Sequence, residues 1–227
     1  MGDHEELAFF DEAGHQLGTK SRQLVHADGE WHWLVFVWCA WLGDDGIPQL
    51  MMQQRARPGD PFIDSLDALA GGHVQAGEGH RLAAVRELEE EAGLRCAPEV
   101  LIYLGGPPLV NLHGSCQRVV QHMYLYDGPV DIMQLDFNEE VCGFVSAPLD
   151  GLARLVGPEP EPPAVHGNAR FGKDPKRSVE ITIAPTAFAS YPAPILEVFH
   201  KSFAIIRTYL LEQRLDIAMW SRPWPER

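Results

Sequence analysis

Apolar and polar residues alternate with a period near two through much of the first 55 positions, which predicts strands separated by glycine turns. The longest apolar run, WLVFVWCAWL at residues 33–42, is far shorter than the roughly 20 residues of a membrane helix. We interpret it as a buried strand, joined through the turn at 43–46 to a second strand at 49–55. Extended segments are also expected at 7–11 and from there towards His26.

Between residues 79 and 92 the spacing of apolar residues changes to a period near 3.6, which predicts a helix. Gly93 follows at the position typical of a helix C-cap glycine. The residues expected to form the buried stripe of this helix are Leu82, Val85, Leu88 and Ala92.

Three further strands and a short helix are predicted after this helix. Apolar runs at 100–104, 119–126 and 141–147 indicate the strands, and the segment after Pro148 indicates the helix. Strands mixed with one central and one terminal helix are typical of an α+β fold built in layers.

The C-terminal third of the chain has a different composition. Proline is frequent from residue 157 to 194, which predicts a long surface loop that holds one strand at 179–184. Apolar spacing at 195–215 predicts a terminal amphipathic helix. We therefore expect one domain at 1–156, with the loop and helix of 157–227 packed on it, which agrees with a length of 227 residues.

The charge of the chain excludes several kinds of partner. Its 32 acidic residues outnumber its 18 basic residues, and the formal net charge is -14. Such a surface repels nucleic-acid backbones and anionic membranes, so neither partner is expected, and a phosphate-bearing small molecule would need a cation as intermediary. No secretory signal pattern is visible and the four cysteines form no C-x-x-C pair, which favours a cytoplasmic protein.

Three glutamates share one side of the helix predicted at 79–92. Glu87, Glu90 and Glu91 are spaced i, i+3, i+4 within one turn, whereas Glu89 falls on another face. Carboxylates this close repel one another unless a cation lies between them, and their oxygens are ligands that Mg²⁺ or Mn²⁺ prefers. Taken alone, the same spacing also fits a solvated acidic face.

The residues around these acids favour the metal site. The segment 72–94 matches the pattern G-x5-E-x7-R-E-U-x-E-E-x-G-U, in which U is a bulky aliphatic residue, at every fixed position. A chance match in such a chain has a probability on the order of 10⁻⁷. This pattern resembles the Nudix box, and the chain resembles a Nudix hydrolase. The fixed positions are Gly72, Glu78, Arg86, Glu87, Leu88, Glu90, Glu91, Gly93 and Leu94.

The resemblance implies both a fold and a chemistry. The implied fold is an α/β/α sandwich with a mixed sheet, in which a loop–helix–loop cradle holds Mg²⁺ or Mn²⁺. The implied activity is hydrolysis of a small-molecule diphosphate linked to another moiety X, such as a nucleoside diphosphate derivative. Glu78 and Arg86 would brace the cradle through a charge-assisted pair. The implied metal ligands are Glu87, Glu90, Glu91 and the carbonyl of Gly71 or of Gly72.

A carboxylate must accept the proton of the attacking water. In Nudix hydrolases this base is a glutamate of the helix or an acid of a later loop. Glu87 is therefore the first candidate, and Glu139 or Glu140 is the second, of which we choose Glu140. Arg55, at the end of a predicted strand, and His73, inside the box, are the predicted substrate-binding residues. Further candidates for a phosphate contact are His80 and His113.

Outside the box, the chain is similar to the isopentenyl-diphosphate-isomerase-like branch of the Nudix family. The isomerases carry a catalytic cysteine and a metal-binding histidine before the box, and a glutamate pair in a later strand. At those places this chain has DSLDA and QHM, so both protonation devices are missing. The segments that carry the similarity are DEAGHQLG, His26 and His32, QLMMQQRA, SLDALAGGHV and NEEVCGFVSAPL.

Two other functions stay open beside hydrolysis. One is an isomerase-like activity, for which His26 and His32 would be remnants of the isomerase metal site instead of surface residues. The other is a Nudix-like binding module without turnover, although such modules commonly lose box glutamates that this chain retains. A homodimer is possible if the apolar terminal helix packs on a second copy.

Overall fold

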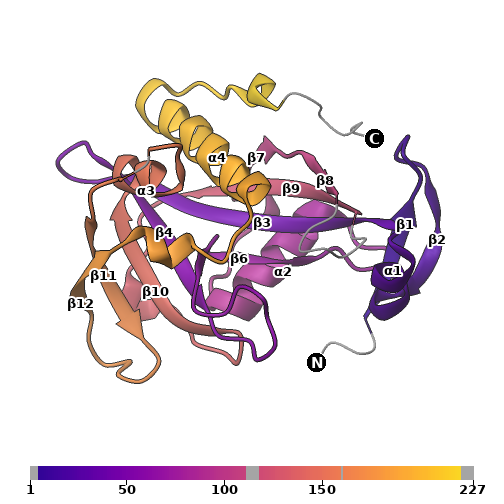
Figure 1. The fold of residues 1–227 in the computed structure, drawn as a ribbon, viewed down its shortest axis with the longest axis horizontal. Coiled ribbons are helices and arrows are strands. Elements are labelled where there is room, and N and C mark those ends of the chain that lie inside the picture. Colours follow the sequence, from indigo (N-terminus) through magenta and orange to yellow (C-terminus); the bar gives the residue numbers. More distant parts are fainter. Residues whose placement is uncertain (1–4, 111–117, 160, 221–227) are drawn as a thin grey trace.

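A single β-sheet forms the centre of the computed structural model, which describes residues 5–110, 118–159 and 161–220 (Figure 1). The strands in chain order are β1 (Glu6–Phe10), β2 (Gln16–Ser21), β3 (Trp31–Leu42), β4 (Pro48–Arg55), β5 (Leu66–Asp67), β6 (Ala70–His73), β7 (Leu101–Gly105), β8 (Pro108–Val110), β9 (Arg118–Asp127), β10 (Val141–Pro148), β11 (Val165–Phe171) and β12 (Val179–Ile183). The helices are α1 (Arg22–Asp28), α2 (His80–Ala92), α3 (Leu149–Val156) and α4 (Ala193–Glu212).

Strand β3 organises this sheet because it pairs with several others. It is antiparallel to β4 and β6, and it is parallel to β9 along most of its length. The main order of strands is β12-β11-β10-β4-β3-β1-β2, and β7 and β8 attach through β9. The sheet is therefore mixed, as the sequence predicts.

The predicted hairpin joins β3 to β4. Cys39 lies opposite Met51, and the turn is closed by the Gly46 amide, which donates to the Gly43 carbonyl at 2.9 Å. Gly46 has a φ of 76°, a conformation that residues with a β-carbon rarely adopt. The long apolar run is thus placed in the middle of the sheet as the buried strand that was expected.

Apolar side chains on the two faces of the sheet form two cores. On one face Trp38 packs edge-on against Phe199 and Phe203 of α4, with 5.1 Å between the ring centroids of each pair. On the other face Val35 of β3 and Leu88 of α2 lie together in the second core. Figure 1 shows α2 and α4 on opposite sides of the sheet, which is the predicted α/β/α sandwich.

Helix α2 occupies the predicted residues but buries a different face. Leu82 is 56 % exposed, whereas Ala83 and Ala84 are fully buried. The predicted stripe is therefore confirmed at Leu88 and Ala92, which are fully buried, and wrong at Leu82. The buried face contains small alanines and the acids Glu87 and Glu91. A search for regularly spaced large apolar residues does not detect such a face.

Two other segments also differ from the prediction. The chain after β2 forms α1, so His26 lies in a helix, which ends where Gly29 adopts a φ of 66°. Residues 157–194 hold two strands of the sheet, β11 and β12, instead of one strand in a surface loop. The prolines of this region lie outside both strands. Strand β11 was not predicted because the high proline content was taken to indicate a loop over the whole region.

The C-terminal segment makes extensive contact with the rest of the sandwich. Strand β11 pairs with β10, and the aromatic side chains of α4 fill the core over β3. The Trp220 indole donates a buried hydrogen bond to the Leu104 carbonyl at 2.8 Å. No helix among the described residues is long and apolar enough to cross a bilayer.

Candidate active site

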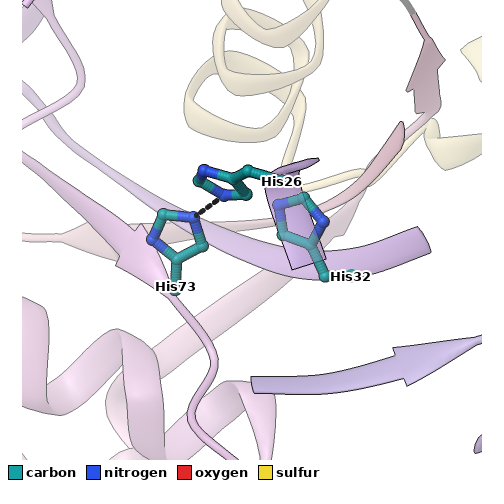
Figure 2. A group of neighbouring side chains, drawn as sticks. All are labelled: His26, His32 and His73. Carbon is teal, nitrogen blue, oxygen red and sulfur yellow. Dashed lines mark hydrogen bonds between the residues drawn. The ribbon is translucent and has the colours of Figure 1, made fainter. Parts of the chain in front are cut away.

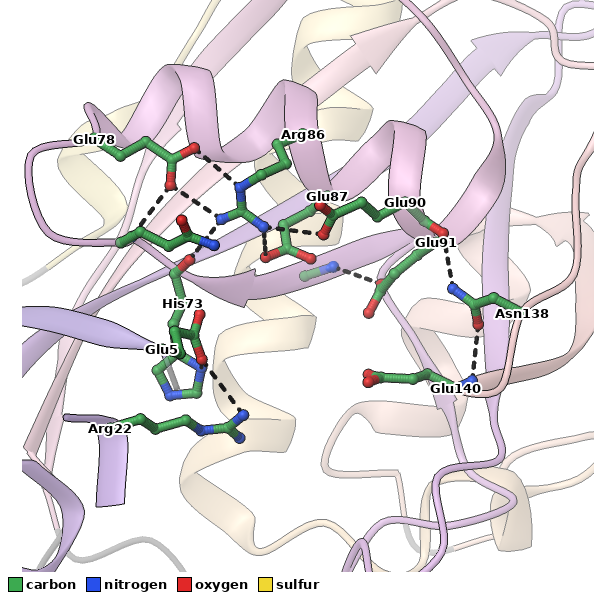
Figure 3. Close-up of polar contacts among 12 residues, drawn as sticks. Glu5, Arg22, His73, Glu78, Arg86, Glu87, Glu90, Glu91, Asn138 and Glu140 are labelled. Atoms are coloured by element: carbon green, nitrogen blue, oxygen red, sulfur yellow. Dashed lines mark hydrogen bonds and ion pairs between the residues drawn. The ribbon is translucent and has the colours of Figure 1, made fainter. Parts of the chain in front are cut away.

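Helix α2 and the strand before it carry the side chains of the site. The helix ends at Gly93, which has a φ of 69° and donates to the Glu89 carbonyl, while the Leu94 amide donates to the Leu88 carbonyl. It packs against β6, so the segment Ala70–His73 runs beneath its acidic face. Figure 3 shows the acids Glu87 and Glu91 pointing from α2 towards this strand.

Arg86 holds the beginning of the site together. Its guanidinium makes a two-point contact with Glu78, with Nε–Oε1 and Nη2–Oε2 distances of 3.0 Å. Nη1 donates to Glu87 at 2.7 Å and to Glu90 at 3.1 Å, and Nη2 donates to the His73 carbonyl at 2.9 Å. A planar, permanently charged group with five donors is suited to this arrangement. Glu78 and Arg86 therefore form the charge-assisted pair that the resemblance implies, and their bracing role stays a prediction.

Glu87 lies against the backbone of Gly72. A β-carbon built on residue 72 would be 2.8 Å from Glu87 Oε2 and closer still to Oε1. Glycine at this position therefore leaves the room that the buried carboxylate occupies. Burial raises the pKa of Glu87 to about 7, although the neighbouring Arg86 acts in the opposite direction.

Glu91 is held from two sides. Its Oε2 accepts hydrogen bonds from the Gly71 amide at 2.9 Å and from Gln53 Nε2 at 2.8 Å. Burial, together with the nearby charge of Glu87, raises the pKa of Glu91 to about 8. Gly71, a predicted ligand position, is therefore placed directly beside this carboxylate.

Glu90 and Glu140 form the open side of the site. The side chain of Glu90 is 57 % exposed, and its backbone carbonyl accepts from Asn138 Nδ2 at 2.8 Å. Asn138 Oδ1 accepts from the Glu140 amide at 2.8 Å, which ties the start of β10 to α2. The carboxylate of Glu140 lies below that of Glu91 in the view of Figure 3, and it pairs with Arg57 at 3.2 Å.

The donor set fits a hard divalent cation. All the side chains that the sequence assigns to the metal are carboxylates, and hard cations prefer oxygen ligands. Two of them, Glu87 and Glu91, are buried with raised pKa values, so a positive charge nearby would favour their ionised forms. Arg86 Nη1 lies between Glu87 and Glu90, so a cation would share these oxygens with the guanidinium.

Arg55 is placed near the site with its charge already paired. Its guanidinium contacts Asp60 and donates to Asp67 Oδ2 at 2.9 Å, and these acids raise its pKa against the effect of burial. The Tyr191 hydroxyl donates to the same oxygen of Asp67 at 2.9 Å. This cluster connects the C-terminal segment to β4. Because the charge of Arg55 is already paired with two acids, Arg55 could contact a substrate only as part of this ion-paired group.

His73 turns its side chain into a group of three histidines (Figure 2). His73 Nε2 is 3.1 Å from His26 Nε2, and the ligand atoms of His26, His32 and His73 lie within 4.8 Å of one another. His32 is 1 % exposed, so it is not a surface residue. Its Nδ1 is 2.9 Å from the Glu30 carbonyl, whereas its Nε2 is buried and has no hydrogen-bond partner among the described residues.

These histidines are neutral at neutral pH. Burial lowers the pKa of His26 to about 4, and it lowers the pKa values of His32 and His73 as well. A neutral imidazole is the form that binds metal ions. Of the remaining candidates, His80 is half-buried with its Nδ1 against the Tyr124 hydroxyl, and His113 lies outside the described residues.

A cavity lies beside Glu78. It has a volume of about 350 Å³, and its walls include the stacked rings of Phe10 and Trp33, which are 4.4 Å apart. The loop of Gln75 and Gly77 forms another wall. This cavity therefore adjoins the loop that precedes α2.

Sequence reasoning missed two polar residues that hold the glutamates. Gln53 supports Glu91 from β4, and Asn138 supports the backbone of Glu90 from the segment before β10. The signal for Gln53 was a polar residue at an inward position of an apolar strand, on the same face as Met51. Asn138 had no comparable signal, because its role depends on the approach of a distant segment.

Comparison with known proteins identifies the family. A sequence profile of the NUDIX domain matches residues 32–166. An uncharacterized Nudix hydrolase from Clostridium acetobutylicum is 31 % identical over 157 residues, which cover 68 % of this chain and 75 % of that protein. Nudix hydrolase 3 of Arabidopsis thaliana is 35 % identical over 92 residues, but these cover 40 % of this chain and only 12 % of the longer plant protein.

The fold agrees with this comparison. The crystal structure of DR0079 from Deinococcus radiodurans matches with a TM-score of 0.50 and 20 % identity, covering 66 % of this chain and 86 % of that one. The sandwich, the box and the braced glutamates define the Nudix class of enzymes. The chain belongs to the Nudix family and is a Nudix hydrolase. Nudix hydrolases generally use divalent metal ions; the similarity to the isomerase-like branch stays a prediction.

Proposed function

We propose that this enzyme hydrolyses a diphosphate linkage in a nucleoside diphosphate-X or related small molecule, with Mg²⁺ or Mn²⁺ as cofactor. The observation that supports the proposal is the pair of buried carboxylates, Glu87 and Glu91, on the helix of a complete Nudix box. Their raised pKa values show an electrostatic cost that a divalent cation would offset. The net charge of -14 gives the same cation a second task, since a diphosphate would otherwise be repelled.

Each residue of the site has a proposed task in this reaction. Glu87, Glu90 and Glu91, with the carbonyl of Gly71, would hold the cation. Arg86, bound by Glu78, would keep Glu87 and Glu90 in place. When bound, the cation neutralises phosphate oxygens and lowers the pKa of the attacking water.

The water's proton requires a base at the site. Glu87 stays our first choice, because its raised pKa of about 7 suits a group that gains and loses a proton near neutral pH. Glu140 is the second choice, since its carboxylate lies below that of Glu91 in the view of Figure 3 and Asn138 links its backbone to α2. Arg55 and His73 stay proposed substrate-binding residues, Arg55 through its ion-paired cluster and His73 through its place beside the cradle.

A substrate panel tests the proposal. Purified protein is incubated with nucleoside di- and triphosphates, ADP-ribose, NADH, coenzyme A, dinucleoside polyphosphates and isopentenyl diphosphate, with Mg²⁺, Mn²⁺ or EDTA. Mass spectrometry should find cleavage of one class that depends on the metal. Cation binding without cleavage of any compound would instead favour the binding module. Size measurement in the same preparation tests the proposed homodimer.

A second candidate function is an isomerase-like activity. The group of His26, His32 and His73 favours it, because the isomerases that the chain resembles also use a metal-binding histidine. The absence of a cysteine in DSLDA opposes it. Conversion of isopentenyl diphosphate to its isomer without phosphate release would support this function, and its absence at high enzyme concentration would reject it.

A further inference from the structure

Gln53 occupies a position in β4 that an apolar residue would ordinarily fill. It is 2 % exposed, and it lies on the face of the sheet that α2 covers, as Met51 does two residues earlier. Strand neighbours Phe144 and Asp67 lie opposite it. A buried amide at such a place is unfavourable unless its polar atoms find partners.

Among the described residues, only one end of this amide has a partner. Gln53 Nε2 donates to Glu91 Oε2 at 2.8 Å, and the Gly71 amide donates to the same oxygen, an arrangement that suits the ionised carboxylate a cation requires. Gln53 Oε1 is buried and finds no hydrogen-bond partner in the part of the chain that the structure describes. The hydrogen-bonding capacity of the Gln53 amide is therefore satisfied at its nitrogen, towards Glu91, and unsatisfied at its oxygen.

The contact to Glu91 selects one of its two oxygens. Gln53 Nε2 and the Gly71 amide both bind Oε2 and thereby orient the carboxylate. Oε1 takes part in neither bond and stays available to a cation. Such outer contacts to metal ligands fix their orientation, and their loss typically costs 10- to 100-fold in metal affinity.

We propose that Gln53 is a positioning residue for the metal site of the Nudix box. Its amide nitrogen orients Glu91, and its unpartnered oxygen accepts a hydrogen bond from a water of the hydration shell that the cation brings. Mg²⁺ and similar ions retain several waters when bound, so the incoming ion supplies the missing donor. This inference rests on the proposed cation site at Glu87, Glu90 and Glu91.

Shape-matched variants separate positioning from packing. Gln53→Met keeps the length of the side chain and removes both polar atoms, and Gln53→Glu keeps the shape and removes the donor. Gln54→Met is the matched control, because the neighbouring Gln54 bonds to the Asp64 carbonyl instead of to a box glutamate. Mn²⁺ affinity is measured by electron paramagnetic resonance of the free ion, and the melting temperature is measured on the same samples.

We expect Gln53→Met and Gln53→Glu to weaken Mn²⁺ binding about 10- to 100-fold, with Gln54→Met unchanged. The melting temperature shows whether each variant is folded, since Gln53→Met removes an unsatisfied buried oxygen together with the bond to Glu91. Native affinity in both folded Gln53 variants would overturn the positioning role. Should Gln53→Met fail to fold, Gln53→Glu decides alone, because its shape is native. Failure of Glu91→Gln to weaken Mn²⁺ binding would instead reject the cation site itself.

Discussion

Gly72 of β6 and Glu87 of α2 are in direct contact, and the Glu87 carboxylate occupies the space where a β-carbon on residue 72 would lie. The two residues are fifteen positions apart, and the sequence alone does not show that they meet. In the structure, Gly72 has no side chain, and this leaves room for the Glu87 carboxylate. The spacing of the box thus reflects a steric requirement as well as a set of ligands.

Substitution of this glycine should displace the glutamate. We expect Gly72→Ala to lower the free energy of unfolding by about 1–3 kcal/mol, because the new methyl group overlaps a buried side chain, and to weaken Mn²⁺ binding. Gly79→Ala is the matched control, since no atom of the described residues lies within 4 Å of a β-carbon there. Equal stability and metal affinity in the two variants, measured by urea unfolding and metal titration, would show that the contact is unimportant.

The raised pKa of Glu91 predicts a particular pH dependence of stability. The folded protein retains this proton up to a pKa of about 8, whereas the unfolded chain loses it near 4.5. The native state then binds more protons between these values, so its stability is lost as the pH rises through this window when EDTA is present. One retained proton gives a slope of at most about 1.4 kcal/mol per pH unit.

The histidines act in the opposite direction below pH 6.5, so the test compares variants. From pH 5 to pH 8, the unfolding free energy of the native chain should fall relative to that of Glu91→Gln. Glu89→Gln, on the exposed face of α2, is the matched control for loss of one acidic side chain from the helix. A constant difference for Glu91→Gln would mean that Glu91 is not buried as the structure has it.

The brace formed by Arg86 should not tolerate lysine. Arg86→Lys keeps the charge but loses the two-point contact to Glu78 and cannot reach Glu87 and the His73 carbonyl together. We expect a loss of about 2 kcal/mol in unfolding free energy, in the range of hydrogen bonds to charged groups. Arg95→Lys, an exposed pair with Glu89, serves as the control. A loss below about 0.5 kcal/mol for Arg86→Lys would remove the bracing role.

Tyr191 should couple the C-terminal segment to the site. Tyr191→Phe removes the hydrogen bond to Asp67 but keeps the ring stacked on Phe62, so a loss of about 2 kcal/mol is expected. Tyr209→Phe removes an exposed hydrogen bond to Asp127 and should change little. Equal effects in thermal unfolding would argue against the proposal that residues 157–227 pack on the same domain as a structural part of it.

Local spacing predicted the central helix and its acids well. The i, i+3, i+4 positions of Glu87, Glu90 and Glu91 and the C-cap at Gly93 are properties of a single helix, so they can be derived from adjacent residues. The exposed Leu82 shows the limit of this reasoning. Which face of a helix is buried depends on the surface against which the helix packs. In α2 the face that packs against the sheet contains alanines and two glutamates, while Leu82 lies outside it.

Contacts between distant segments could not be derived in this way. Gln53 meets Glu91 only because β4 and α2 lie on one side of the sheet, and His26 meets His73 only because α1 folds back beside β6. Arg55 was predicted as a substrate-binding residue on its charge alone, and the acids Asp60 and Asp67 that pair with it were not foreseen. Strand β11 was missed because proline content was assigned to the whole region.

The most direct test of the central claim is hydrolysis of the best substrate in ¹⁸O-labelled water, with mass spectrometry of both products. The account predicts one ¹⁸O atom in a phosphate group of one product, dependence on Mg²⁺ or Mn²⁺, loss of turnover in Glu91→Gln, and native turnover in Glu89→Gln. Label in a product without phosphate, turnover in EDTA, or an active Glu91→Gln variant would contradict water attack on phosphorus at the metal-binding glutamates of α2.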